Sequence, residues 1–176
     1  MTEAPQPYIW QSGALPRETF TPWFTRVVAA LIDVTPVIIL TALGLAFAFL
    51  TGNSSCVSTG TELGAGMSCS SAWTPAGVVV FTLLDLAVLA IVIWNYGYRQ
   101  GTTGCSVGKS VMKFRVVSEK TWQPIGFGPS IIRQLAHVLD AALCYIGYLL
   151  PLWDAKRQTF ADKIMTTVCI PIPPTA

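Results

Sequence analysis

Two apolar stretches decide the fold: VVAALIDVTPVIILTALGLAFAFL from Val27 to Leu50, and AGVVVFTLLDLAVLAIVIWNY from Ala76 to Tyr96. They contain 24 and 21 residues, and each has a single formal charge, Asp33 in the first and Asp85 in the second. A helix needs about 20 mostly apolar residues to cross the hydrocarbon core of a bilayer. Buried helices of soluble proteins rarely run this long without a polar stripe. We therefore predict two full transmembrane helices, at 24–51 and 75–96.

The composition of the whole chain agrees with a membrane protein. Of the 176 residues, 52% are hydrophobic and only 11% are charged, whereas an ordinary soluble domain has roughly 25% charged residues. The length fits one domain, and the apolar content excludes disorder. The net charge of +2 and the wide spacing of the basic residues argue against nucleic acid as a partner. The bilayer is the expected partner.

The distribution of Lys and Arg predicts the orientation. Segment 52–74 contains neither, while segment 97–129 holds five of them, and cytoplasmic flanks carry the excess of positive charge. We therefore expect 52–74 to be an outer loop, and 1–22 and 97–129 to be cytoplasmic. The first apolar stretch is longer than the roughly 7 to 15 apolar residues of a secretory signal, so we expect it to remain in the mature protein.

A third apolar segment, 130–153, allows two interpretations. Its charges leave only the 13 residues of 141–153 without a charge, which is short for a span and typical of a re-entrant piece. A helix bent back on itself would put the tail, 154–176, in the cytoplasm. A single tilted third span would put the tail outside. The predicted fold class is an all-α membrane protein with two full spans and this third segment.

Two short runs predict a small sheet beside the spans. Segments 113–117 (KFRVV) and 166–170 (TTVCI) are rich in β-branched residues. If the tail is cytoplasmic, the two runs lie on the same side of the membrane and can pair.

The five cysteines divide by position. Cys56 and Cys69 both lie in the predicted outer loop, where an oxidising compartment permits a disulfide. Such a bridge contributes about 3 kcal/mol on the chain-entropy model. Cys105, Cys144 and Cys169 fall inside the cell or the membrane, and we assign them no role.

One turn resembles two catalytic motifs. GCSVG, from Gly104 to Gly108, matches the nucleophile elbow G-x-S-x-G, but that elbow needs a preceding strand and an acid and a His behind the Ser. The following GKS matches the end of a phosphate-binding loop, yet Thr103 stands where the pattern needs Gly. We predict a flexible turn and no catalytic residue, cofactor or metal site.

The intramembrane charges are the candidate functional residues. Arg26 and Asp33 are seven residues apart, as are Arg133 and Asp140, with His137 on the face of the second pair. Within one helix each pair is separated by ~10 Å of rise, so pairing between helices is more natural.

A carboxylate inside the membrane is costly and must face protein or water. Pro36 leaves the carbonyl of Ile32 free beside Asp33, an arrangement suited to a cation or a proton. The alternative is a buried polar network that fixes how the segments pack. Asp85 fits either interpretation.

Together these features resemble the RDD family of small bacterial membrane proteins. The resemblance covers 22–170 and depends on the two R-x6-D segments, on the turn leading into KFRVV, and on RQTFADKIMTTVCI at 157–170. It implies that the Arg and the two Asp of the family name are Arg26, Asp33 and Asp140, and it implies a multi-pass protein of the bacterial plasma membrane. The family usually has Gly near Thr166, whereas this chain has MTT. Asp85 and the cysteine pair are further departures.

The resemblance suggests transport, because sodium or proton exchange has been suggested for some members. Our first expectation is a protein that handles a cation or a small solute, with Asp33 and Asp140 as ligands and the two arginines setting their pKa values. Since three or four helices hardly enclose a pathway, a homo-oligomer or a larger membrane complex is implied. The alternative expectation is an accessory subunit without chemistry of its own.

Overall fold

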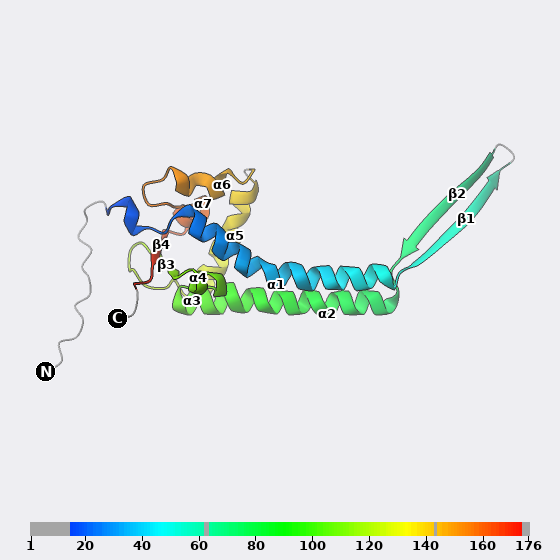
Figure 1. The fold of residues 1–176 in the computed structure, drawn as a ribbon, viewed down its shortest axis with the longest axis horizontal. Coiled ribbons are helices and arrows are strands. Elements are labelled where there is room, and N and C mark those ends of the chain that lie inside the picture. Colours follow the sequence, from blue (N-terminus) through cyan, green and yellow to red (C-terminus); the bar gives the residue numbers. More distant parts are fainter. Residues whose placement is uncertain (1–14, 62–63, 143, 174–176) are drawn as a thin grey trace.

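A computed structural model describes residues 15–61, 64–142 and 144–173. Its longest elements are two antiparallel helices that lie side by side and form a stem (Figure 1). Helix α1 is Trp23–Leu50, and α2 is Pro75–Val92. By length and composition these two helices suit membrane spans. The prediction of two long apolar helices is confirmed.

Helix α2 continues beyond the predicted end of the second span. A π-helical stretch, Ile93–Arg99, and then α3, Gln100–Thr103, extend it without a break. The segment that we expected to be loop from residue 97 therefore begins as helix, because the apolar pattern ends before the helical backbone does.

Small residues allow the two long helices to approach closely. A Cβ atom at Gly44 would lie 3.1 Å from the ring of Phe81, and one at Gly77 would lie 3.2 Å from the Cα of Ala48. Thr74 caps α2 by accepting a hydrogen bond from the backbone N–H of Gly77.

A β-hairpin closes one end of the stem. Its strands are β1, Asn53–Thr61, and β2, Gly64–Ala72. Cys56 and Cys69 are opposite each other in the register and form the predicted disulfide. Figure 1 shows the hairpin projecting away from the rest of the molecule.

All the remaining described elements gather at the other end of the stem (Figure 1). A 3-10 turn, Arg17–Thr19, precedes α1. The others, in chain order, are α4 (Val107–Val111), β3 (Phe114–Ser118), α5 (Phe127–Ala142), α6 (Ile146–Leu149), a 3-10 turn (Leu150–Leu152), α7 (Phe160–Ile164) and β4 (Thr167–Pro171).

The third apolar segment is bent, as the first of its two interpretations predicts. Helix α5 and the segment Ile146–Leu152 meet at 105°, and Cys144 and Tyr145 in the break have positive φ angles. Strand β4 then pairs antiparallel with β3, which places the tail beside the segment that follows α3. The predicted pairing of these two runs is confirmed.

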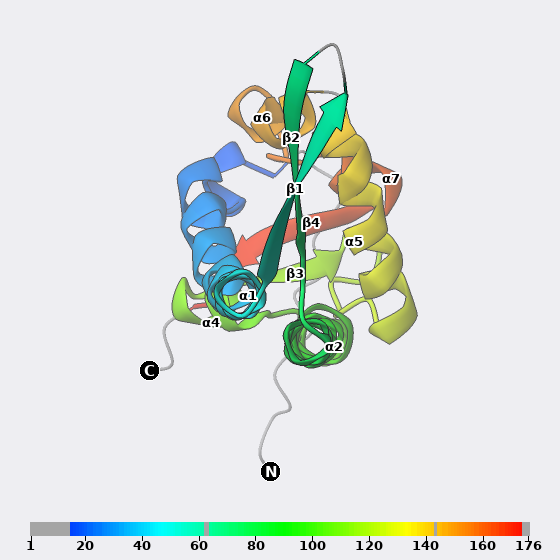
Figure 2. The same cartoon turned by 90° about the vertical axis from the view of Figure 1, so that its right-hand side faces the viewer.

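The end opposite the hairpin contains the same arrangement twice. In the first copy an R-x6-D segment in α1 contacts the short helix α4, which β3 follows. In the second copy an R-x6-D segment in α5 contacts α7, which β4 follows. Figure 2 shows α1 and α5 on either side of the paired strands.

The short helices and strands of the two copies correspond when positions 53 apart are compared, whereas the two R-x6-D segments are 107 positions apart. Ser106 caps α4 and Thr159 caps α7. The residue before each strand has a positive φ angle, 55° at Lys113 and 47° at Thr166. In the antiparallel register Val116 pairs with Cys169, its own counterpart, so the strands are related by an approximate two-fold axis through that pair. The core at this axis consists of Val116, Cys169, Phe114 and Ala29.

Candidate functional site

Asp33 is buried in the wall of this end of the molecule. Its carboxylate accepts hydrogen bonds from the side-chain amide of Asn95 at 2.9 Å and from the backbone N–H of Gly108 at 2.7 Å. The hydroxyl of Ser106 donates to its second oxygen. Buried carboxylates are stabilised by such donors, especially backbone N–H groups. The hydrogen bonds of Asp33 therefore hold α4 against α1.

The turn from Gly104 to Lys109 supplies these donors. Gly104 has a φ of 78°, a backbone conformation that glycine adopts readily, and Ser106 caps α4 by accepting from the N–H of Lys109. A Cβ atom at Gly108 would lie 2.0 Å from the carbonyl oxygen of Ala29. The G-x-S-x-G spacing thus follows from close packing of α4 on α1. The hydroxyl hydrogen of Ser106 is committed to Asp33.

Asn95 is a site residue that the sequence analysis missed. It lies in the π-helical stretch, donates to Asp33 and accepts a hydrogen bond from the N–H of Val107 at 2.8 Å. Burying an amide side chain in an apolar helix is costly unless both its oxygen and its NH2 group form hydrogen bonds. An Asn within the second span could therefore have indicated a buried hydrogen-bonding residue.

Asp140 performs the same task in the second copy. Its carboxylate accepts from the N–H groups of Phe160 and Ala161, at 3.0 and 3.4 Å, and contacts the Nδ1 of His137 at 2.7 Å. The backbone is also close on another side, because a Cβ atom at Gly147 would lie 2.1 Å from an Asp140 oxygen. Asp140 therefore fastens α7 to α5.

The two arginines contact a different acid from those we expected. Arg26 is 2.9 Å from one oxygen of Asp162, and Arg133 is 2.6 Å from the other. The expectation that they accompany Asp33 and Asp140 is corrected here: those two acids already face backbone N–H groups, and Asp162 lies between the arginines. Although burial opposes ionisation, the charges of Arg133 and Arg26 hold the pKa of Asp162 well below its ordinary value.

A local signal for Asp162 was present in the sequence. Thr159 and Asp162 have the spacing of a capping box, and each side chain accepts from the other residue's backbone N–H. That motif predicts a helix start but not a partner, because the two arginines are far away in the sequence.

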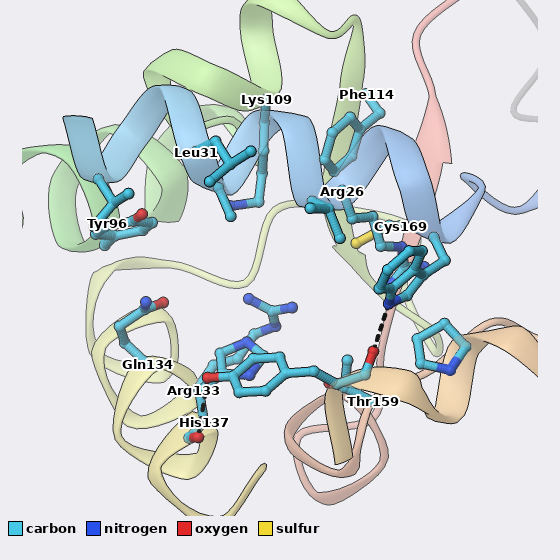
Figure 3. Close-up of a pocket in the computed structure, with 16 residues that line it drawn as sticks. Arg26, Leu31, Tyr96, Lys109, Phe114, Arg133, Gln134, His137, Thr159 and Cys169 are labelled. Atoms are coloured by element: carbon cyan, nitrogen blue, oxygen red, sulfur yellow. Dashed lines mark hydrogen bonds between the residues drawn. The ribbon is translucent and has the colours of Figure 1, made fainter. Parts of the chain in front are cut away.

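A partly open cavity of about 440 Å³ lies between α1 and α5. Its cationic lining consists of Arg26, Lys109 and Arg133, and no Asp or Glu is among the residues that line it. In Figure 3, Lys109 and Arg133 extend into the same space from opposite sides. Three of the predicted site residues, Arg26, Arg133 and His137, therefore line the cavity together with Lys109, which we had placed only in a turn.

Lys109 is held in place by local contacts. Its ammonium group donates to the hydroxyl of Ser106 at 3.2 Å and lies 5.3 Å from the ring centre of Tyr96, within the range of a cation–π interaction. Burial and the nearby charge of Arg133 lower the pKa of Lys109 to about 8. At neutral pH it is mostly charged.

Arg26 has unused hydrogen-bonding capacity. Its Nη1 binds Asp162, but its Nη2 is buried and has no partner within the described part of the chain. An unpaired buried donor costs about 1 to 3 kcal/mol, more when the group is charged. A bound acceptor would remove that cost.

The other predicted residues lie elsewhere. Asp85 is half-buried in α2, and within the described ranges it has no hydrogen bond or ion pair. The disulfide of Cys56 and Cys69 is in the hairpin, at the far end of the stem. Among the residues that the structure describes, no three His, Cys, Asp or Glu side chains are grouped so as to hold a metal ion.

A comparison with known protein families identifies the family of this chain. A model of the RDD family matches residues 20–166. The chain belongs to the RDD family. The resemblance carried by the R-x6-D segments is thereby confirmed, and so is the coarse assignment to a family of membrane proteins.

Relatives of this RDD chain occur in mycobacteria. It is 56% identical over 158 residues to a protein named proline-rich antigen homolog from two strains of Mycobacterium tuberculosis, and 52% identical over 159 residues to the proline-rich antigen of Mycobacterium leprae. The matches cover 90% of this chain and 66% and 64% of those proteins, so the chain spans about two thirds of their length. No solved structure matches this RDD chain.

Proposed function

We propose that this RDD protein binds a small anionic solute in the cavity between α1 and α5. The observation that carries the proposal is the lining: Arg26, Lys109 and Arg133 face one cavity, and no Asp or Glu of the described part of the chain lines it. Arginine and lysine side chains that converge in a partly desolvated site are suited to phosphate and carboxylate groups. The Nη2 of Arg26, which is buried and has no hydrogen-bond partner among the described residues, supports the same ligand class.

Cation handling at Asp33 and Asp140 has weaker support. Each carboxylate already accepts hydrogen bonds from two or three donors, including backbone N–H groups. A cation at either residue would have to displace those donors and loosen a short helix. The small solute of our expectation is therefore proposed to be an anion, and the two acids are proposed to hold the site together.

The proposal also covers the membrane in which the protein lies, its orientation and its oligomeric state. We place it in the bacterial plasma membrane with the cavity end in the cytoplasm, because the Lys- and Arg-rich segment is at that end. Two long helices and one bent pair leave little room for an enclosed pathway. Movement of the solute across the membrane would therefore need a homo-oligomer or a larger complex. No catalytic step, cofactor or metal is part of the proposal.

Binding of inorganic phosphate to the purified full chain in a neutral detergent tests the proposal. Lys109→Met removes a charge from the cavity without leaving Asp162 unpaired, and we expect phosphate affinity to fall at least about 10-fold, the equivalent of one charge-assisted hydrogen bond. Lys120→Met, in an exposed turn, is the matched control and should bind like wild type. Equal binding by wild type and Lys109→Met, or no binding by either, would refute the proposal.

The pH profile gives a second readout. A lysine carries its charge below its pKa, so the contribution of Lys109 should be lost as the pH rises through about 8, well before an ordinary lysine titrates at about 10.4. The charged or titratable groups acting on it are Arg133, Cys169, Asp33 and Asp162. A ratio of wild-type to Lys109→Met phosphate affinity that stays constant from pH 7 to pH 9.5 would contradict the role given to Lys109, since the ionisation of phosphate itself affects both proteins alike.

A further inference from the structure

The wall of the cavity is as informative as its charges. On the α1 side it is formed by Val27, Ala30, Leu31 and Val34. These residues belong to a helix that we interpret as a membrane span, and Leu31 is 58% exposed although it lines the cavity. The mouth of the cavity is therefore apolar on this side and faces the region that lipid would occupy.

An apolar track leads from this mouth along α1. Val27, Leu31, Val34 and Ile38 are spaced by four, three and four residues, so they lie on one face of the helix. Ile38 is 59% exposed and lies beyond the cavity, away from the charged end. The cations Arg26, Lys109 and Arg133 lie near Leu31, as Figure 3 shows, and Ile38 is about two helical turns further along α1.

We propose that the anionic solute is an amphiphile: a phosphate headgroup bound by Lys109, Arg133 and Arg26, with a hydrocarbon chain lying along α1 from Leu31 toward Ile38. The inference rests on the proposed anion site and adds the ligand class to it. A phosphate group offers several strong acceptor oxygens and suits a cluster of cations. A hydrocarbon chain suits a track that leads into the bilayer. The ligand enters sideways, from the membrane.

The charges of the site limit which substitutions are informative. Arg26 and Arg133 also hold the buried Asp162, so removing either would break one of the two ion pairs that join α1 and α5 to α7 and would disturb the fold. Lys109 and Leu31 have no such second partner. Lys109→Met tests the headgroup, and Leu31→Asn tests the chain. Leu83→Asn is the matched control for the chain, because Leu83 is 60% exposed on α2 and does not line the cavity.

Native mass spectrometry of the full chain, released from a neutral detergent, counts the bound molecules directly. The probes are dodecyl phosphate, dodecyltrimethylammonium and inorganic phosphate. We expect wild type to retain one dodecyl phosphate, to bind it at least 100-fold more tightly than inorganic phosphate, and not to retain the cationic amphiphile. Dodecyl phosphate partitions into the micelle around α1 and is concentrated beside the mouth of the cavity, whereas inorganic phosphate stays in the bulk water.

The variants separate the two parts of the ligand. Lys109→Met should weaken both phosphate probes at least 10-fold. Leu31→Asn should weaken dodecyl phosphate at least 10-fold and leave inorganic phosphate within twofold of wild type, which also shows that the variant is folded. Leu83→Asn should change neither probe.

Three outcomes would overturn the inference. Binding of inorganic phosphate as tight as that of dodecyl phosphate would leave the anion site in place but exclude the amphiphile. Equal retention of dodecyltrimethylammonium would show that the chain alone determines binding. Binding of neither phosphate probe would overturn the proposed function together with this inference.

Discussion

Three buried carboxylates at the cavity end are stabilised in two different ways. Asp33 and Asp140 accept hydrogen bonds from the first N–H groups of short helices, groups that no intrahelical carbonyl can reach. Asp162 instead lies between two guanidinium groups. The first kind of contact fixes a short helix on a long one, and the second joins α1 to α5 through α7. Asp162 is thus the residue on which the relative position of the two cavity walls depends.

Substituting Asp162 tests this at the level of single residues. Asp162→Asn should destabilise the protein by about 3 to 5 kcal/mol, because it leaves the buried Arg133 and the partly buried Arg26 without their shared counter-charge. For a chain of this size that corresponds to a fall in Tm of roughly 6 to 20 °C. Asp154→Asn is the control: the pair of Asp154 with Lys163 is partly exposed and should contribute less than about 1 kcal/mol. Equal Tm values for the two variants would contradict the role of Asp162 in holding α1 and α5 together.

At this scale the sequence predicted the acids but not their partners. Asp33 and Asp140 were recognisable as candidate site residues, because a charged side chain in an apolar membrane segment is energetically costly. The hydrogen-bond donors to these two carboxylates were not recognisable, since nearly every residue has a backbone N–H group and the sequence does not show which ones act as donors. Asp162 lies among other charges near the end of the chain, where an acid is unremarkable. Lys109 resembled a lysine of a surface turn because its burial depends on α1 and α5, which are distant in sequence.

At the scale of elements, the duplicated unit explains several local features together. Each unit needs a long helix with a carboxylate, a capped short helix and a strand that begins after a residue with positive φ. The spacing of the arginines and acids was visible in the sequence, and so were the two strands. The turn before β4 was less predictable: Thr166 adopts a φ of 47°, a conformation unfavourable for a β-branched residue.

Gly108 provides the test of how α4 docks on α1. Gly108→Ala should lower stability by about 2 to 3 kcal/mol, because the new Cβ would lie 2.0 Å from the carbonyl oxygen of Ala29 and the helices would have to separate. Gly128→Ala is the matched control, because a Cβ there meets nothing within 4 Å. It should change the stability by less than about 1 kcal/mol, because the greater helix propensity of alanine is opposed by the steric restriction on a residue that precedes proline, here Pro129. Thermal unfolding of both variants in detergent measures the difference, and a Gly108→Ala protein as stable as wild type would disprove the close docking.

At the scale of the whole molecule, the stem separates two structurally different ends. The hairpin with its disulfide is at one end, and the cavity with the duplicated units is at the other (Figure 1). Helix α1 has 28 residues, or about 42 Å at the rise of an α-helix, enough to cross a bilayer with its headgroups. The two ends therefore lie on opposite sides of the membrane if the stem spans it. The bend after α5 and the pairing of β3 with β4 keep the tail on the cavity side.

Sidedness can be measured with single cysteines in intact cells. Ser54→Cys in the hairpin should react with a membrane-impermeant maleimide added outside. Lys120→Cys, between β3 and α5, and Lys156→Cys, in the tail, should react only after the cells are permeabilised, because the paired strands keep both segments on one side. All three positions are exposed, so slow labelling cannot be attributed to burial. External labelling of Lys156→Cys but not of Lys120→Cys would require a third complete span and would separate β3 from β4. Reversed labelling of all three would preserve the fold and place the anion cavity outside the cell.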